Sequence, residues 1–167
     1  MPFLYYGDEI GMKYLDVPTK EGGYFRTGAR TPMQWDNSTN LGFSDANASD
    51  LYLPVDASED APTVAAQEND PASLLSTVRA ILALRHQEED LQADAAFKVV
   101  CSEAGKPFVY RRGKLLCAVN PAGSEQSVAL PAAVTESLSG DVLFELGKTS
   151  LKDGVLTVGA QSFVVMK

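Results

Sequence analysis

The sequence is poor in the residues that build metal centres and disulfide frameworks. In 167 residues it has one histidine, His86, and two cysteines, Cys101 and Cys117. A metal site needs several spaced ligands, so we expect no metal and no other cofactor. Two cysteines do not make a disulfide framework. Both lie among apolar neighbours, where a thiol behaves as a small hydrophobic side chain.

The chain also lacks an excess of positive charge and any long apolar run. Its net charge is −8, and this charge is unevenly distributed. Residues 1–96 carry 16 acidic and 6 basic side chains, whereas residues 97–167 carry 6 acidic and 8 basic ones. An acidic surface repels phosphate, so we expect small neutral molecules rather than nucleic acid or membrane as partners. With no charged leader at its start, the sequence predicts a cytoplasmic protein.

The first third of the chain predicts one strand and a long loop. Phe3–Tyr6 is a short apolar run closed by Gly7, which is typical of a buried strand with Asp8 and Glu9 at its C-terminal end. Residues 11–51 show neither helical nor alternating periodicity, and several glycines interrupt them. A loop of this length inside a compact domain is usually functional or disordered.

A helix is predicted after residue 70, because Asp70 can cap it and Pro71 suits its first position. Its apolar residues recur at helical spacing and form one stripe: Leu74, Leu75, Val78, Ile81 and Leu82. Soluble monomers rarely expose such a stripe. We therefore expect the helix to pack on the following domain, or the chain to associate with itself.

The last 71 residues contain short β-prone runs separated by turn residues such as Asp153-Gly154. The predicted strands are Phe97–Cys101, Pro107–Arg111, Leu115–Val119, Ser127–Leu130, Val142–Leu146, Val155–Val158 and Ser162–Met166. Strands at this spacing favour an antiparallel sandwich. Five aromatic residues occupy alternating positions that resemble core positions, namely Phe97, Phe108, Tyr110, Phe144 and Phe163.

Two motifs near the start identify a family resemblance. Tyr5–Met12 reads YYGDEIGM and Arg30–Asp36 reads RTPMQWD, and Leu51–Pro54 follows in the expected order. On these motifs the chain resembles the α-amylase superfamily, glycoside hydrolase family 13, in its branch of α-glucosidases, oligo-1,6-glucosidases and trehalose synthases. A complete (β/α)8 barrel takes about 250 residues. The resemblance therefore implies a C-terminal fragment of such an enzyme.

The resemblance also implies an α+β architecture in two parts. Residues 1–92 correspond to the last strand, rim loop and last helix of the catalytic barrel, and residues 93–167 to the antiparallel all-β sandwich that follows it. Family members carry their catalytic nucleophile, acid/base and third carboxylate on earlier strands, so we expect no catalytic residue here. Neighbouring residues of a strand point to opposite faces, so Asp8 and Glu9 are predicted to hold loops by hydrogen bonds rather than to flank one scissile bond.

Candidate binding residues follow from the second motif. Relatives carry arginines at the positions of Arg26 and Arg30, and a guanidinium offers fixed donors to sugar hydroxyls or to a carboxylate. The resemblance implies that Arg26 reaches the non-reducing glucose and that Arg30 braces the loop. Trp35, with Phe43, is a weaker candidate for stacking against a sugar, and Asp8 and Glu9 are weaker still.

One departure from the family pattern lies beside these arginines. Phe25, Thr27 and Gly28 stand where relatives have serine, aspartate and asparagine. We therefore expect the geometry of this loop, and with it the linkage preference, to differ from that of the relatives. A purely structural role, in which both arginines tie the loop to barrel carboxylates, remains open.

Three functions are consistent with the sequence. The leading hypothesis is the C-terminal part of a glycosidase acting on α-glucosidic bonds of small oligosaccharides, inactive alone because its catalytic carboxylates lie upstream. A stand-alone carbohydrate-binding sandwich is the second. The third is an interaction protein whose strand and helix dock on another polypeptide or on a second copy.

Overall fold

The computed structural model describes residues 3–18 and 25–167. The chain divides into two compact units, Met1–Ala80 and Ile81–Lys167, each described separately below. This division falls inside helix α2, Leu74–Gln87. The sequence predicted a different boundary, between residues 92 and 93, where the barrel part of the family ends and its sandwich domain begins. That boundary stays a prediction. Within the described ranges, no helix is long and apolar enough to cross a bilayer.

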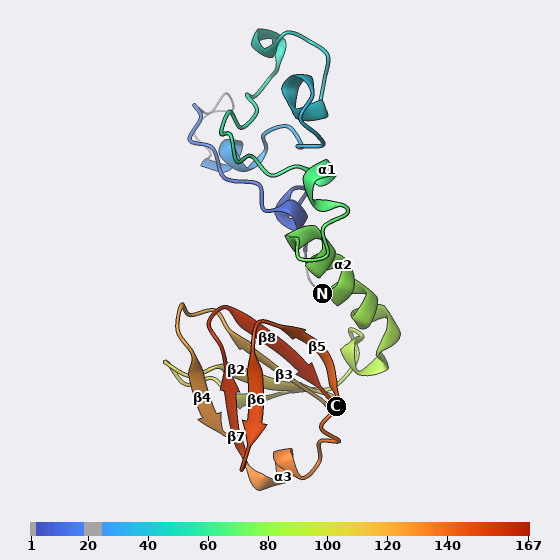
Figure 1. The fold of residues 1–167 in the computed structure, drawn as a ribbon, viewed down its shortest axis with the longest axis vertical. Coiled ribbons are helices and arrows are strands. Elements are labelled where there is room, and N and C mark those ends of the chain that lie inside the picture. The colour runs from blue at the N-terminus through green and yellow to red at the C-terminus, as the bar shows by residue number, and fades with distance from the viewer. Residues whose placement is uncertain (1–2, 19–24) are drawn as a thin grey trace. The chain divides into compact units, whose positions relative to one another are not determined.

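Loops and short helical turns make up the first unit (Figure 1). Its elements before α2 are η1 Asp8–Ile10, η2 Phe25–Ala29, η3 Thr39–Gly42, η4 Ala48–Asp50 and α1 Val64–Gln67. Ile10, Met33 and Leu75 form its small core, with Met12 and Val64 packed against them. The long loop expected over residues 11–51 is confirmed over its described part, interrupted only by these short 3-10 turns.

Phe3–Tyr6, predicted as a buried strand, forms no strand in the structure. Its side chains are 41% to 89% exposed. A strand needs a neighbour for its backbone N–H and C=O groups, and no strand of the described first unit lies beside this run. The prediction of a strand at Phe3–Tyr6 was wrong. An apolar run indicates that the residues favour burial, but it does not indicate which segment would pair with them.

Helix α2 begins later than predicted. Asp70 accepts a hydrogen bond from the backbone N–H of Ala72, 2.8 Å away, in the turn before the helix. The N-cap is instead the buried Ser73, whose Oγ accepts from the N–H of Ser76 at 3.1 Å. In the first unit Leu75 packs on the small core, 7% exposed.

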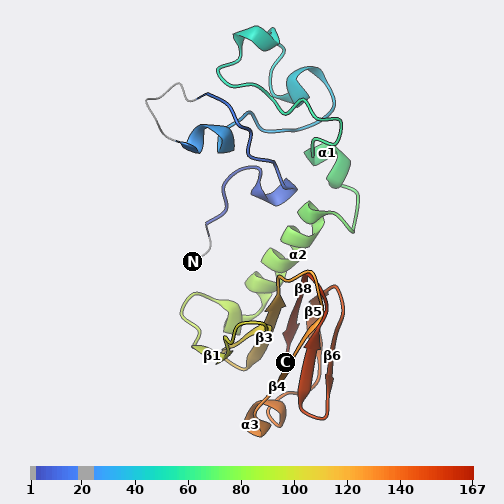
Figure 2. The same ribbon diagram turned by 90° about the vertical axis from the view of Figure 1, so that its left-hand side faces the viewer.

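The second unit is an antiparallel β-sandwich of two sheets (Figure 2). Its strands are β1 Phe97–Cys101, β2 Phe108–Arg112, β3 Leu115–Asn120, β4 Gln126–Ala129, β5 Val142–Leu146, β6 Thr149–Lys152, β7 Val155–Val158 and β8 Ser162–Met166. One sheet has the order β1-β2-β3-β8-β5 and the other the order β4-β7-β6. A short helix, α3 Ala132–Thr135, lies at one end of the sandwich.

Apolar residues from both sheets fill the space between them. Val109, Leu116 and Val164 come from the five-stranded sheet, and Leu156 and Val158 from the three-stranded one, and all five are 0% exposed. Because each strand alternates faces, such residues occur at every second position. The sandwich therefore has a complete core of its own.

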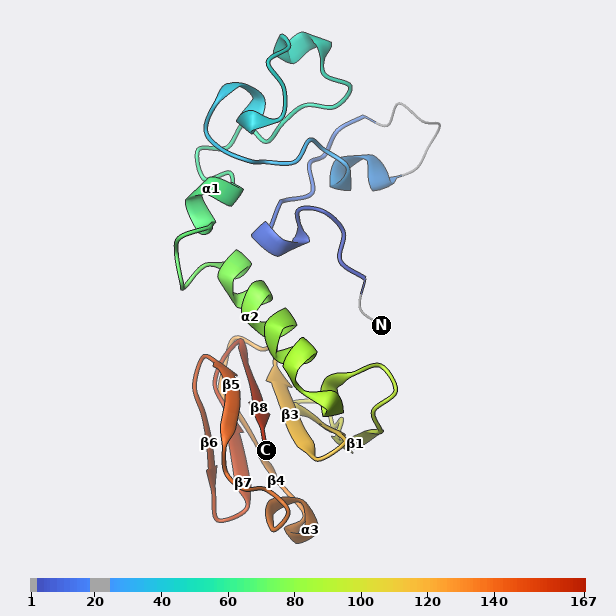
Figure 3. The ribbon, with the colours of Figure 1, turned by 90° about the vertical axis from the view of Figure 1, so that its right-hand side faces the viewer.

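A second apolar cluster lies on the opposite face of the five-stranded sheet. Leu115, Cys117 and Val165 are buried there, and Leu84 of α2 and Leu91 of η5 (Glu89–Leu91) pack against them. Figure 3 shows the end of α2 and the η5 segment beside β3 and β1. Leu84, which the predicted stripe omitted, is thus a residue of α2 that packs against this sheet.

The five aromatic residues expected in core-like positions belong to this outer face. Phe144 and Phe163 pack in its cluster with ring centroids 5.9 Å apart. The ring of Tyr110 lies 5.4 Å from that of Phe97 and 5.2 Å from that of Phe108. Alternating residues along a strand show that the two faces of the sheet differ. They do not show which face lies between the two sheets, especially when both faces carry apolar residues.

These observations confirm the predicted fold class, an α+β chain ending in an antiparallel sandwich. The sequence did not reveal α3 or the polar strand β6. Strand β6 pairs with β7 through the turn at Asp153-Gly154, where both residues have positive φ, 49° and 77°. An Asp-Gly pair of this conformation is the preferred two-residue hairpin turn. The Asp153-Gly154 turn in the sequence could therefore have predicted β6, whereas the residues of β6 itself could not.

Candidate functional site

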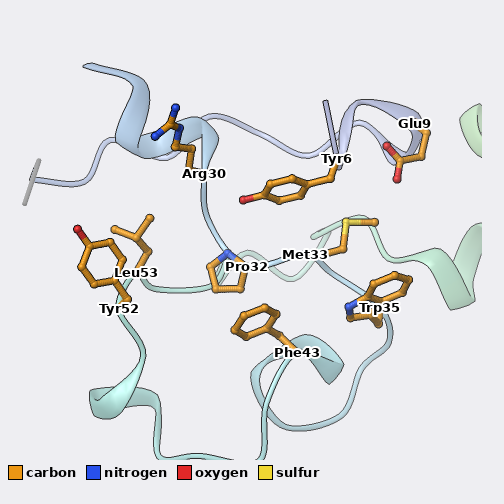
Figure 4. Close-up of a pocket in the computed structure, with 9 residues that line it drawn as sticks. All are labelled: Tyr6, Glu9, Arg30, Pro32, Met33, Trp35, Phe43, Tyr52 and Leu53. Carbon is orange, nitrogen blue, oxygen red and sulfur yellow. The ribbon is translucent and has the colours of Figure 1, made fainter. Parts of the chain in front are cut away.

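The first unit contains an open hollow of about 530 Å³ with mainly apolar walls (Figure 4). The hollow is lined by Tyr6, Glu9, Arg30, Pro32, Met33, Trp35, Phe43, Tyr52 and Leu53. Its volume is in the range of small-molecule sites, which combine apolar walls with few polar groups. Arg30 and Glu9 are its charged members. All nine residues belong to the first unit.

The RTPMQW motif forms the floor of the hollow. Thr31 and Gln34 are 1% exposed, and Pro32 and Met33 are also buried. The backbone carbonyl of Gln34 accepts from the N–H of Val64, at the start of α1, at 3.1 Å. A buried polar side chain must be hydrogen-bonded, and the Nε2 of Gln34 donates to the carbonyl of Pro62. The motif therefore ties the long loop to α1.

Trp35 and Phe43 form one wall, and each is 50% exposed. The N–H of Trp35 donates to the carbonyl of Leu41, 2.8 Å away, and its own carbonyl accepts from the N–H of Ala65 at 2.8 Å. The turn before Phe43 has positive φ at Asn40 and Leu41. Backbone hydrogen bonds therefore hold the main chain that carries Trp35, while both aromatic side chains stay half exposed.

Asp8 and Glu9 both hold the backbone at the edge of the hollow. Asp8 Oδ2 accepts from the N–H of Tyr5 at 2.9 Å, and Glu9 Oε2 accepts from the N–H of Gly7 at 2.9 Å. Gly7 has φ of 92°, and a Cβ there would lie 2.5 Å from the sulfur of Met12. Glu9 lines the hollow, and Asp8 does not.

Tyr6 lies across the hollow from Pro32 (Figure 4). Its hydroxyl donates to the carbonyl of Thr31, 3.0 Å away. The pKa of Tyr6 is raised above its usual value, mainly by burial and to a smaller extent by the neighbouring Tyr5. A neutral hydroxyl joined to the RTPMQW motif therefore connects the two sequence motifs.

The two arginines take different positions. Arg30 lines the hollow and follows η2, with its N–H bonded to the carbonyl of Thr27 at 3.0 Å. Its guanidinium makes no hydrogen bond or ion pair with residues 3–18 or 25–167. Arg26 is exposed in η2 and does not line the hollow.

Gly28 explains why the loop departs from the family pattern. A Cβ at Gly28 would lie 1.9 Å from the backbone oxygen of Leu15. The N–H of Leu15 donates to the carbonyl of Gly28 at 3.0 Å, and the hydroxyl of Tyr14 donates to the carbonyl of Phe25 at 2.7 Å. Only glycine allows this close backbone approach. An asparagine would force residues 14–17 away from η2.

The structure thus brings together Arg30, Trp35 and Glu9, and leaves Arg26 and Asp8 outside the hollow. Sequence reasoning missed Tyr52 and Leu53 as lining residues. They belong to the Leu51–Pro54 segment, whose place in the resemblance was the available signal. Tyr6 was expected to be a core residue, but it is 41% exposed and forms part of the wall.

The chemistry available in the hollow is limited. Aromatic faces, one guanidinium and one carboxylate suit a neutral polar ring, which can stack and accept hydrogen bonds. A retaining glycosidase needs two carboxyl groups about 5 to 5.5 Å apart, and Glu9 is the one acid among the described lining residues. Across the described ranges, no three His, Cys, Asp or Glu side chains gather to hold a metal.

A sequence model described as "Alpha amylase, catalytic domain" matches residues 1–94, more than half of the chain. The chain belongs to this α-amylase family of glycoside hydrolases, as the two motifs predicted.

Three comparisons illustrate the relationship. The trehalose synthase/amylase TreS of Mycobacterium tuberculosis is 46% identical over 92 residues, which are 52% of this chain and 14% of the relative. The trehalose synthase of Thermus thermophilus is 32% identical over 174 residues, 98% of this chain and 18% of the relative. A crystal structure of a MutB mutant, from crystals soaked with trehalulose, matches 99% of this chain over 35% of its own length, with TM-score 0.83 and 21% identity.

The structural match supports the fold alone, because its identity is low. The chain spans less than a fifth of the length of the two trehalose synthase relatives. What the whole relatives do is therefore a hypothesis for this chain.

Proposed function

We propose that this chain is the part of a glycosidase that closes one side of its sugar site, in an enzyme acting on α-glucosidic bonds of small oligosaccharides. The observation that carries the proposal is the hollow in which Arg30 and Trp35 of one family motif meet Tyr6 and Glu9 of the other. The names of the trehalose synthase relatives support an α-linked glucoside as the substrate class.

In this proposal each lining group has one task. The guanidinium of Arg30 donates to sugar hydroxyls, and the open faces of Trp35 and Phe43 stack against the apolar face of the ring. Glu9 accepts from a hydroxyl with the oxygen that its backbone bond leaves free. Arg26, outside the hollow, reaches a sugar that extends past η2.

We further propose that the chain alone does not hydrolyse glucosides. Both acids of the first motif, Asp8 and Glu9, accept backbone N–H bonds, which fix them as loop-holding groups. Adjacent residues of one short turn do not flank a scissile bond from two sides. The catalytic pair belongs to the earlier strands of a family catalytic domain.

A cytoplasmic location is supported by the thiols. Cys101 is buried between the sheets and Cys117 on the outer face, and both are free. Unpaired cysteines suit a reducing compartment.

The first test is an activity assay. The purified chain is incubated with p-nitrophenyl α-glucoside, maltose, isomaltose and trehalose, and no product above the no-protein control is expected. Turnover that scales with the concentration of this chain would show that it carries its own catalytic pair.

The second test measures binding through Trp35, the sole tryptophan. Maltose, isomaltose and trehalose are expected to change its fluorescence in a saturable way. Arg30→Ala should weaken binding by about tenfold, the equivalent of one charge-assisted hydrogen bond. Arg79→Ala, an exposed arginine on α2 paired with Glu68, is the matched control and should bind normally. Equal weakening by both variants, or no response to any sugar, would contradict the sugar site.

A further inference from the structure

A second hollow, of about 260 Å³, adjoins the one lined by Arg30 and Trp35. The two share Tyr52 and Leu53 as lining residues, and both belong to the first unit. The other walls of the second hollow are Val17, Pro18, Ala48, Leu51 and Pro54. Six of its seven lining residues carry only hydrocarbon side chains, and the seventh is a tyrosine. We call it the apolar hollow, and the one with Arg30 and Trp35 the sugar hollow.

The two hollows meet at one end of the sugar hollow. A smaller space of about 90 Å³ is lined by Thr27, Arg30, Tyr52 and Leu53, so it joins Arg30 to the two shared residues. Figure 4 shows Tyr52, Leu53 and Arg30 on one side of the sugar hollow and Trp35 on the opposite side. A ligand that extends from Trp35 past Arg30 therefore meets the apolar hollow next.

Backbone hydrogen bonds hold both sides of the apolar hollow. On one side, the N–H of Leu51 donates to the carbonyl of Ala48, the first residue of η4, at 3.4 Å. On the other side, the N–H of Val17 donates to the carbonyl of Leu15 at 2.9 Å. Leu53, between them in the list of walls, is 6% exposed. The apolar hollow is therefore built from anchored segments of the loop.

The walls of the apolar hollow suit a different chemical group from those of the sugar hollow. Among its described lining residues none is charged, and Tyr52 alone has a polar side chain. A sugar ring brings several hydroxyls, and each hydroxyl buried without a hydrogen bond costs free energy. An aryl or alkyl group brings none and is stabilised by the apolar area that it buries. The hollow therefore favours an apolar group over a second sugar ring.

We propose that the apolar hollow holds the apolar aglycone of an α-glucoside, an aryl or alkyl group, while the glucose ring lies in the sugar hollow beside Arg30 and Trp35. Tyr52, which lines both hollows, faces the link between the two parts of the ligand. The inference rests on the proposed function, because the sugar hollow must hold the glucose ring. It extends the substrate class from oligosaccharides to glucosides whose second part is not a sugar.

The test compares methyl α-glucoside with phenyl α-glucoside, which carry the same sugar and the same linkage and differ in the aglycone. Binding of each to the full chain is measured by isothermal titration calorimetry. Phenyl α-glucoside is expected to bind at least about tenfold more tightly, because its ring leaves water for the apolar hollow.

Ala48→Asp is the variant that tests the apolar hollow. Ala48 is exposed and lines the apolar hollow but not the sugar hollow, so the variant adds a charge there without disturbing a buried side chain. It should weaken binding of phenyl α-glucoside about tenfold and leave methyl α-glucoside within about twofold. Ala46→Asp is the matched control, an exposed alanine two residues earlier that lines neither hollow. It should keep the preference for the phenyl compound.

Four outcomes separate this inference from the proposed function. Equal affinities for the two glucosides, both lowered by Arg30→Ala, would overturn the inference and uphold the sugar site. A preference that Ala48→Asp leaves intact, or that both aspartate variants reduce equally, would also overturn it. Binding of phenyl α-glucoside that Ala48→Asp weakens and Arg30→Ala does not would uphold the apolar hollow and contradict the sugar site. Binding of neither glucoside would contradict both.

Discussion

The two units of this chain use apolar residues in opposite ways. Among the described residues, the second unit has thirteen buried hydrophobic residues and five exposed large ones. The first unit has four buried and ten exposed. Both are similar in length, so the difference reflects architecture. The sandwich closes a core from its own strands, whereas the first unit presents surface that suits contact with another body or a ligand.

The comparison predicts where a cavity is most costly. Leu156 of β7 is 0% exposed between the two sheets, and Leu156→Ala should reduce the free energy of unfolding by about 2–5 kcal/mol. Leu146→Ala, at a position 43% exposed, is the control and should cost less than about 1 kcal/mol. Urea unfolding followed by circular dichroism measures both. Equal losses would mean that the sandwich core is not the principal source of stability.

A smaller and local effect is expected in the first unit. Gly28→Ala places a methyl group 1.9 Å from the backbone oxygen of Leu15 and should cost about 1–3 kcal/mol of local stability. Hydrogen exchange at the amide of Leu15, bonded to the carbonyl of Gly28, should accelerate, while amides of the sandwich keep their rates. Gly123→Ala, where a Cβ meets nothing within 4 Å, is the control. Unchanged exchange at Leu15 would refute the close approach.

The smallest effect is a pH dependence confined to the second unit. Burial raises the pKa of Tyr110 from 10.0 to about 12 and that of Cys117 from 9.0 to about 11. The folded state therefore holds these protons more tightly than the unfolded state. Their contribution to stability is complete below about pH 9 and is lost as the pH rises through about 11 and 12.

Tyr110→Phe tests this dependence. The variant should show a shallower loss of stability between about pH 10 and 12 in urea titrations at each pH. Phe108→Leu changes the neighbouring ring without removing a titrating group and should keep the original slope. A slope that Tyr110→Phe leaves unchanged would assign the alkaline loss to other groups.

The same contrast explains how far the sequence could predict the structure. In the second unit, seven strands were predicted within one residue at either end, because turn residues bound short alternating runs. Strand β6 was missed because Thr149–Lys152 is short and mostly polar. Tyr110 does pack against an apolar cluster, as its core-like position predicted, but alternation did not tell which face of the sheet this cluster covers.

In the first unit, local pattern was a weaker guide. The family motifs suggested Arg26, Arg30 and Trp35 as sugar-binding residues, which stays a prediction; Arg30 and Trp35 line the hollow and Arg26 does not. Phe3–Tyr6 has a strand-like pattern without a strand neighbour, because pairing is a tertiary property. Ser73 rather than Asp70 caps α2, a shift of three residues that helix-start signals do not resolve.

The central claim is that the sandwich is stable through its own core and that the first unit is not. Residue-resolved hydrogen exchange of the isolated chain tests it most directly. We expect the slowest amides in β3 and β8, at the centre of the five-stranded sheet, to exchange only through global unfolding. Amides of residues 31–53 should exchange at least about a hundredfold faster, through local opening. Equal protection in the two units would contradict the account.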